Sequence, residues 1–155
     1  RILLIIYSYE MKYLLKSPKS KDELVSYFSF RWEMLRKPLG MNKNSSLDEY
    51  ENDSFHIMAI TNTKKIIGCG RVHLNKNKEN QIRFMAVSHN YQRMGVGSNI
   101  LINLENYISS NGQKTITLNA REEAVKFYLS MGYSKREMKT SEIAIPHIRM
   151  VKSLS

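Results

Sequence analysis

Apolar positions in the first half of the chain predict one helix followed by a two-stranded hairpin. Residues 20–37 carry apolar side chains at helical spacing, and Pro38 with Gly40 is expected to end this helix. The apolar positions of this helix are Leu24, Val25, Phe28, Trp32 and Leu35. Residues 55–60 and 65–74 are rich in β-branched side chains and flank a short polar turn, which predicts a hairpin.

Other segments of the first half are marked by their composition. Met11–Leu15 is a candidate strand, while residues 1–10 are either sequence upstream of a natural start at Met11 or a first strand. Residues 42–53 form a polar, acidic loop. Gly68 and Gly70 interrupt the second strand of the hairpin, which indicates a bulge or a close approach of backbone there.

The second half begins with a strand and continues with a long helix. Residues 81–87 predict the strand, and from Gly95 onward the apolar period becomes helical. The apolar positions of this helix are Val96, Ile100, Leu104 and Ile108. Gly112 is placed to cap its C-terminal end, and residues 115–118 follow as a short β-branched strand.

A further helix is expected immediately after that strand. Asn119 and Glu122 have the spacing of a capping box, with Asn119 as the N-cap and Glu122 at the third helical position. The apolar face of this helix comprises Ala124, Phe127, Tyr128 and Met131, and the helix ends at Gly132.

The last two strands are residues 133–138 and 143–151, the second of them interrupted by Pro146. Strands therefore outnumber helices about two to one in a mixed order, which predicts an α/β (α+β) fold. Neither an internal repeat nor a linker composition is visible, so residues 1–155 are interpreted as one domain.

Composition narrows the classes of protein that remain. The formal net charge is +10, which would suit a polyanionic partner, but most of the cations are dispersed lysines, so nucleic acid is not the expected partner. Cys69 is the single cysteine and the four histidines are scattered, so no disulfide and no metal site is expected. No apolar run approaches the roughly 20 residues of a membrane span, and a reducing cytoplasm is the expected location.

Residues 83–98 combine a strand, a loop with two glycines and the start of a helix. Gly95 and Gly97 would let backbone N–H groups approach an anion, and the helix N-terminus adds a partial positive charge. A P-loop would need a different glycine spacing followed by lysine, and a dinucleotide-binding loop would need glycine at Ile100. The segment alone predicts either a diphosphate site or an ordinary helix-start turn.

The segment resembles the pyrophosphate-binding motif Q/R-x-x-G-x-G/A of the GNAT superfamily of N-acetyltransferases, through Gln92, Gly95 and Gly97. The flanking order of strand, helix, short strand, and a helix bearing Tyr128 before Gly132 also matches that family. Further similarity, to a bacterial branch of mostly unassigned acceptor, lies at residues 31–40, 68–71, 118–121 and 142–147. The resemblance implies a mixed six- to seven-stranded sheet with three to four helices, whose central strands splay apart at the acyl-CoA site.

The resemblance also implies acetyl-CoA as cosubstrate, without a metal. The implied cofactor-binding residues are Met85, Ala86, Val87, Gln92, Arg93, Met94, Gly95, Val96, Gly97, Ser98, Asn119, Phe127 and Tyr128. Met85 to Val87 would act through backbone groups, with the Val87 N–H as donor to the thioester carbonyl. Met94 departs from the family, which commonly has a cation there, and Arg93 is the neighbouring cation that would make the phosphate contact.

The catalytic residues implied by the resemblance are Tyr128, Glu142 and His147. Tyr128 either protonates the departing thiolate or is simply core, as its apolar stripe suggests. Glu142 and His147 are the candidates for general base, and they share a cavity only if Pro146 introduces a bulge, since an odd separation puts strand side chains on opposite faces.

The predicted activity is transfer of an acetyl group to a primary amine on a small molecule or a peptide, and a homodimer is left open. Arg31, Trp32 and Arg71 are candidates for the acceptor pocket, although each has a plain structural explanation. A basic surface suits acidic acceptors, whereas the acidic part of the loop, Asp48–Asp53, would suit a polyamine or an aminoglycoside. The alternatives to an enzyme are a CoA-binding module without turnover and a basic nucleic-acid-binding domain.

Overall fold

The computed structural model describes residues 4–8, 11–139 and 143–155. In the first half the elements are β1 (Leu4–Ser8), β2 (Met11–Lys16), α1 (Lys21–Leu35), β3 (Phe55–Thr61), β4 (Ile66–Leu74) and β5 (Asn80–Val87). In the second half they are α2 (Val96–Ser110), β6 (Thr115–Arg121), α3 (Val125–Ser130), β7 (Ser134–Lys139) and β8 (His147–Ser153). Short 3₁₀ turns join several of them, including η3 (Glu51–Asp53) and η5 (Glu122–Ala124).

The described strands form one mixed sheet in the order β1-β2-β3-β4-β5-β6-β8-β7. All neighbours are antiparallel except β5 and β6, which are parallel. The parallel pairing is short: Asn80–Ile82 of β5 pair with Ile116–Leu118 of β6. The two central strands therefore diverge beyond Ile82. This arrangement confirms the predicted mixed sheet with splayed central strands, and β1 adds an eighth strand at its edge.

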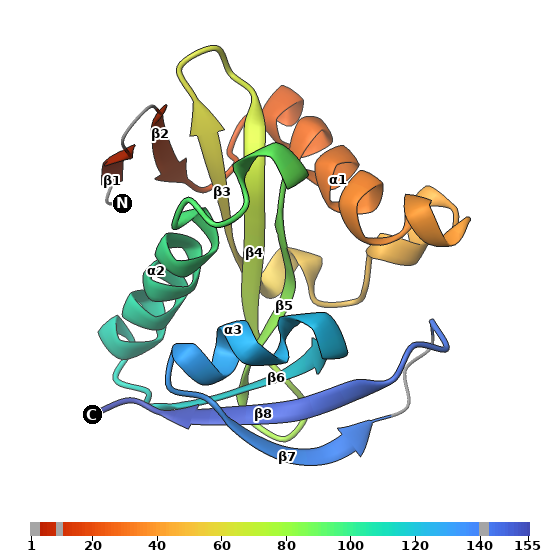
Figure 1. Cartoon of the computed structure of the whole chain (residues 1–155), viewed down its shortest axis with the longest axis vertical. Helices are drawn as coiled ribbons and strands as arrows, with labels where there is room; N and C mark the ends of the chain where they lie inside the picture. The colour runs from red at the N-terminus through yellow and green to blue at the C-terminus, as the bar shows by residue number, and fades with distance from the viewer. Residues whose placement is uncertain (1–3, 9–10, 140–142) are drawn as a thin grey trace.

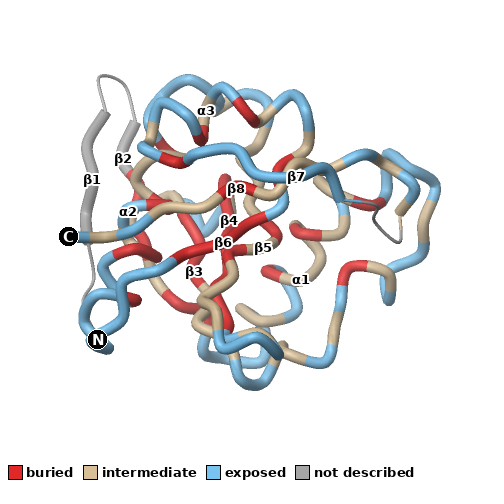
Figure 2. The backbone as a smooth tube through the Cα atoms, turned by 90° about the horizontal axis from the view of Figure 1, so that it is seen from below, coloured by how far each residue is buried: buried red, intermediate tan, exposed pale blue. Residues whose placement is uncertain are grey.

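Helices cover both faces of the sheet, and the upper part of the sheet lies between α1 and α2 in Figure 1. Alternate residues of β3 show how the faces divide: Ile57 packs in the cluster that contains α2 and α3 residues, whereas Met58 packs with Tyr27 of α1. The period of two along a strand produces this alternation. Figure 2 shows buried backbone concentrated in β4 and β6 at the centre, and β7 exposed at the edge.

A bulge in β5 separates the paired half of that strand from the half that lines the splay. Cys69 pairs with Ala86 and Arg71 pairs with Arg83, so β5 has one residue more than β4 between these pairs. Phe84 lies within the bulge and has a φ of 59°, an uncommon conformation for a residue that is not glycine. The bulge bends β5 away from β6 where the parallel pairing has ended.

Close packing of α2 on β4 explains the two glycines of the predicted hairpin. A Cβ added at Gly70 would lie 2.7 Å from Met85 Sδ, and one at Gly68 would lie 2.7 Å from Ile100 Cδ1. Both distances are far below van der Waals contact. The hairpin of β3 and β4 and the expected close approach are therefore confirmed.

The first predicted helix is confirmed, but the face that it buries is different. Ser20 and Glu23 form a complete capping box, and α1 ends at Leu35 before Pro38. Val25, expected in the core, is 59% exposed, whereas Tyr27 and the cation Arg31 are fully buried. The apolar pattern misplaced this face because the buried arginine is paired with carboxylates distant in sequence.

Two boundaries in the second half differ from the prediction. Asn119 is not a helix cap: β6 continues to Arg121 because residues 115–121 pair with β8, and the helical turn begins only at Glu122 without a side-chain cap. The last strand begins at His147 rather than at residue 143. The other predicted helix ends are confirmed, since Gly112 and Gly132 have φ values of 74° and 93°.

Candidate active site

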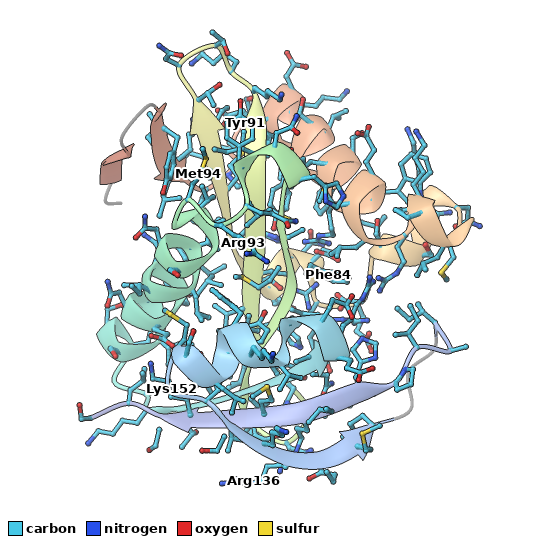
Figure 3. The ribbon with its side chains drawn as sticks, viewed as in Figure 1. Phe84, Tyr91, Arg93, Met94, Arg136 and Lys152 are labelled. Carbon is cyan, nitrogen blue, oxygen red and sulfur yellow. The ribbon has the colours of Figure 1, made fainter. Side chains whose placement is uncertain are left out.

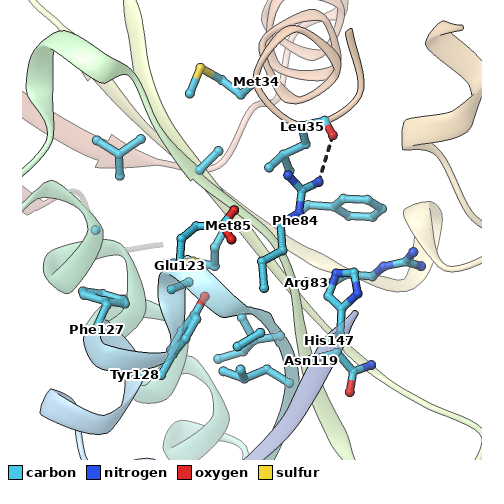
Figure 4. A pocket seen from close by; sticks show the side chains of 18 of the residues that line it. Met34, Leu35, Arg83, Phe84, Met85, Asn119, Glu123, Phe127, Tyr128 and His147 are labelled. Atoms are coloured by element: carbon cyan, nitrogen blue, oxygen red, sulfur yellow. Dashed lines mark hydrogen bonds between the residues drawn. The ribbon is translucent and has the colours of Figure 1, made fainter. Parts of the chain in front are cut away.

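A cavity of about 1010 Å³ lies where β5 and β6 diverge. On one face of the sheet it is lined by residues of α2 and α3, and on the other by Met34, Leu35 and Arg36 at the end of α1. Its middle is formed by residues 81–87 of β5 and 118–121 of β6. Because the lining comes from both faces of the sheet, the cavity passes between the two diverging strands (Figure 4).

The N-terminus of α2 forms one end of the cavity. Gly95 precedes the helix with a φ of 83°, and the first helical bond that it accepts comes from the Asn99 N–H at 3.0 Å. The N–H groups of Val96, Gly97 and Ser98 therefore lack partners within the helix, which is the arrangement that binds anions. Arg93 lies beside them over the sheet (Figure 3).

The open edge of β5 supplies a backbone donor to the cavity. The Ser88 N–H donates to the Ile67 carbonyl at 2.8 Å, so Gly68 and Val87 form a non-hydrogen-bonded antiparallel pair. The N–H and C=O of Val87 consequently point away from β4, toward the cavity. The Gln92 amide donates to that carbonyl at 3.1 Å, which fixes the loop before α2 against the end of β5.

Tyr128 lies on the α3 side of the cavity, with its hydroxyl directed inward in Figure 4. It is 7% exposed, and burial raises the pKa of its phenol well above the usual value, so the hydroxyl keeps its proton at neutral pH. No residue that the structure describes forms a hydrogen bond with this hydroxyl. Phe127 packs edge-on against it and borders Gly97, where a Cβ would be 3.6 Å from the Phe127 ring.

A cross-strand row of basic side chains lies on the α1 side. Arg121 of β6 pairs with His147 of β8, and His147 pairs with Lys139 of β7, so the three side chains project to the same face. All three line the cavity. Arg121 donates to the Leu35 carbonyl at 2.9 Å, which confirms that this face is the one that α1 covers.

His147 is suited to accept a proton near neutral pH. Burial lowers its pKa below 6.5, and the positive charges of Arg121, Arg36 and Arg83 lower it further, against a hydrogen bond to Ile145 that raises it. Nδ1 donates to the Ile145 carbonyl at 2.7 Å, so the neutral ring carries its lone pair on Nε2. The other candidate base, Glu142, lies outside the described residues.

Most of the cofactor residues implied by the sequence line this cavity. They are Met85, Ala86, Val87, Gln92, Arg93, Gly95, Gly97, Ser98, Asn119, Phe127 and Tyr128. Met94 does not line it and is 43% exposed, and the Val96 side chain is buried under the helix. Asn119 shares the face of Arg121, two residues away, and therefore projects to the side opposite Tyr128.

The three residues considered for the acceptor pocket do not line the cavity. Arg31 and Arg71 are fully buried, and Trp32 donates to the Met41 carbonyl at 2.8 Å. Arg31 binds Glu51 at 2.8 Å and Arg71 binds Asp48 at 2.7 Å, so these cations hold the acidic loop against the sheet. Arg31 and Arg71 therefore have a structural role, which was the alternative explanation for these residues.

Arg121 and Lys139 are site residues that the sequence reasoning missed. Arg121 belonged to a matched segment, residues 118–121, but was given no role. The alternation of β6 could have placed it beside Asn119, whereas the position of Lys139 depends on long-range pairing with β8.

The described residues offer neither a reactive cysteine nor a metal site. Burial raises the pKa of the Cys69 thiol to about 12, so it is not a nucleophile. Within the described ranges, the His, Cys, Asp and Glu side chains do not gather into a group of three or more that could hold a metal ion. No helix in those ranges is long and apolar enough to cross a membrane.

Comparison with known proteins gives a consistent family. A model described as an acetyltransferase (GNAT) domain matches residues 20–154. The uncharacterized N-acetyltransferase YjcF of Bacillus subtilis (strain 168) is 30% identical over 135 residues, covering 86% of this chain and 95% of the relative. The structure of Escherichia coli ElaA matches with a TM-score of 0.76 at 18% identity, over 92% of this chain and 99% of that chain. An aminoglycoside 6'-N-acetyltransferase complexed with coenzyme A matches with a TM-score of 0.73 at 15% identity, over 90% of this chain and 96% of that chain.

The chain belongs to the GNAT family of N-acetyltransferases. It is an acetyl-CoA-dependent acyltransferase of the EC 2.3.1 class, and its relatives bind CoA or acetyl-CoA.

Proposed function

We propose that this enzyme transfers the acetyl group of acetyl-CoA directly to a primary amine in a ternary complex. The observation that carries the proposal is the cavity between β5 and β6, which is lined from both faces of the sheet. The cofactor enters from the α2 side and the amine from the α1 side, so the reacting atoms meet between the strands without a covalent enzyme intermediate.

The residues on the α2 side fit the cofactor. The unpartnered N–H groups at the start of α2, with Arg93, bind the diphosphate, and the absent side chain at Gly97 leaves room between Val87 and Phe127. The outward N–H of Val87 donates to the thioester carbonyl oxygen, where negative charge develops during attack.

Proton transfers at the two ends of the reaction use different side chains. His147 accepts the proton that the amine loses as its nitrogen bonds to the acetyl carbon. The carbon–sulfur bond breaks, and the Tyr128 hydroxyl gives its proton to the departing thiolate. Solvent then restores both residues. At neutral pH the Tyr128 phenol is protonated and the His147 ring, with its lowered pKa, is neutral, which are the states that these two roles require.

The test is Tyr128→Phe, with Tyr133→Phe as the matched control. Tyr133 is the adjacent buried tyrosine, 5.7 Å away between ring centroids, and its hydroxyl donates to Glu105 at 2.8 Å. We expect Tyr128→Phe to lower kcat about 100-fold or more with acetyl-CoA affinity retained, because a general acid contributes at least this much. Tyr133→Phe should keep its turnover and lose about 2 kcal/mol of stability, because its hydrogen bond to the Glu105 carboxylate is removed.

Thiol release with a panel of amines, and calorimetric titration with acetyl-CoA, measure the two effects. Full turnover in Tyr128→Phe would remove this residue from the mechanism. Tight acetyl-CoA binding by the wild type with no amine acetylated would instead favour a CoA-binding module without turnover.

A further inference from the structure

The α1-side mouth of the cavity, defined by Arg36, Arg83, Arg121, Lys139 and His147, is rich in positive charge. Four of these five residues are permanently cationic. Among the described residues that line the whole cavity, one carboxylate is present, that of Glu123, which comes from η5 beside α3. The mouth through which the acceptor enters is therefore basic.

Of the four carboxylates in the acidic loop, residues 42–53, Asp48 and Glu51 are turned inward, and Asp48 pairs with one member of the mouth, Arg83. Asp48 accepts from Arg71 and from Arg83, at 2.7 and 2.8 Å, and is 9% exposed. Glu51 contacts Arg31 and Arg71, at 2.8 and 3.1 Å, and is 14% exposed. These two carboxylates are occupied by internal ion pairs. The exposed carboxylates of the loop, Glu49 and Asp53, do not line the cavity, so the loop places no carboxylate next to Arg121 or Lys139.

Arg121 is the cation of the mouth best placed to hold an anion. Its guanidinium reaches the end of α1 and donates one hydrogen bond, to the Leu35 carbonyl. No carboxylate in the described part of the chain pairs with it, and its remaining donors are not buried. A guanidinium presents five N–H donors in a planar fork that matches a carboxylate or a phosphate. Lys139, exposed at the end of the same row, adds charge without crowding it.

We propose that the acceptor is a small primary amine that also carries an anionic oxygen group, a carboxylate or a phosphate, bound by Arg121. This inference rests on the proposed function and names its substrate class. The anionic group binds the guanidinium of Arg121, and Lys139 adds positive charge at the outer end of the row, beyond His147. The amine of the same molecule lies between His147 and the acetyl carbon. The basic mouth attracts such acceptors and repels polycationic ones.

Matched pairs of amines test the proposal. We would compare β-alanine with β-alaninamide, and O-phosphoethanolamine with ethanolamine, using spermidine as the polycation. The anionic member of at least one pair should have a kcat/KM about 10-fold or more above its uncharged analogue, and the pair that shows the preference identifies carboxylate or phosphate. Equal kcat/KM values within both pairs, or a preference for spermidine, would overturn the proposal.

The variant Arg121→Gln tests whether Arg121 causes the preference for anionic amines. We expect KM for the preferred anionic amine to rise about 10-fold or more, since a hydrogen bond to a charged group is lost, with little change in kcat. KM for the uncharged analogue and for acetyl-CoA should stay constant, and Arg121→Lys should restore part of the loss. An equal loss on charged and uncharged amines would reduce Arg121 to a structural residue.

Two further variants, both at exposed positions, separate an effect on acceptor binding from an effect on folding. Lys139→Gln removes an exposed charge of the mouth and should raise the same KM by a smaller factor. Arg136→Gln is the matched control, because Arg136 is an exposed arginine on β7 that does not line the cavity (Figure 3). An effect of Arg136→Gln as large as that of Arg121→Gln would mean that only overall charge matters.

Failure of the proposed function is distinguishable from failure of this inference. If no amine is acetylated, the proposed acetyl transfer is wrong. The anion site at Arg121 is then tested by titrating CoA-saturated protein with β-alanine, O-phosphoethanolamine and their uncharged analogues. Tighter binding of an anionic member in wild type, lost in Arg121→Gln, supports the anion site. Equal binding within both pairs rejects it.

Discussion

Asp48 joins the acidic loop to the sheet, so Asp48→Asn tests the buried ion-pair network directly. Both oxygens of Asp48 accept from Arg71, at 2.7 and 2.9 Å, and one also accepts from Arg83 at 2.8 Å. Arg71 is fully buried. The substitution keeps the size of the side chain and removes its charge, which leaves Arg71 with a weaker partner in a place that water does not reach.

The expected cost follows from what remains around Arg71. Removing one member of a buried ion pair costs about 3–5 kcal/mol, because the other charge is left uncompensated. Glu51 still contacts Arg71 at 3.1 Å, so the lower end, about 3 kcal/mol, is expected. In a chain of 155 residues this corresponds to a fall in Tm of roughly 6–12 °C.

Urea unfolding of the wild type and Asp48→Asn gives this difference, and Glu23→Gln is the control. Glu23 pairs with Lys16 at the surface, where an ion pair contributes under about 1 kcal/mol. A loss for Asp48→Asn no larger than for Glu23→Gln would refute the reasoning about the buried network.

The pH dependence of stability is a second test of the ion pairs of Asp48. Burial alone would raise the pKa of Asp48, but hydrogen bonds and charge from Arg71 and Arg83 hold it at about 2. Because this pKa is below its unfolded value of about 4, the contribution to stability is present above pH 4 and is lost as pH falls toward 2. Asp48→Asn should lack this part of the acid sensitivity.

Of three other predictions, two concern the site and one concerns the packing of α2 on β4. In the wild type, the acid limb of kcat/KM should lie below pH 6.5, because burial and nearby arginines lower the pKa of His147 and its protonation removes the base. His147→Asn should lose this limb, and an unchanged limb would exclude His147 as the base. Gly70→Ala should lower the free energy of unfolding in urea by about 1–3 kcal/mol, because its Cβ would lie 2.7 Å from Met85 Sδ and 2.9 Å from Ile100 Cγ2. Unchanged stability would show that α2 can move away from β4 at little cost. Gly97→Val should weaken acetyl-CoA binding about 10-fold in calorimetry with Tm retained, because the added methyl groups enter the space between Val87 and Phe127, and undiminished affinity would place the cofactor elsewhere.

Features encoded by neighbouring residues were predictable from the sequence. The end of α1 before Pro38 and the start of α2 after Gly95 depend on backbone preferences of the residues at those points. The α2 end of the cavity was likewise predictable, since the strand, the glycine turn and the helix that form it are contiguous in the chain.

Features decided by distant contacts were not predictable. The inward face of α1 contains Arg31 because Glu51, twenty residues later, returns to neutralise it. Asn119 stays in β6 because pairing with β8 extends that strand past the apparent capping box. The bend of β5 occurs at Phe84, and the strand contains no glycine or proline that would have predicted it.

Hydrogen exchange at the end of β5 tests the central claim most directly, namely that the cofactor binds along the open edge of this strand. The Val87 N–H points into the cavity, whereas the adjacent Ser88 N–H already donates to Ile67. Exchange of both amides would be followed by NMR with and without saturating acetyl-CoA. We predict that Val87 exchanges fast in the free protein and at least about 10-fold more slowly in the complex, while Ser88 changes little. Unchanged exchange at Val87 in the saturated complex would contradict the account.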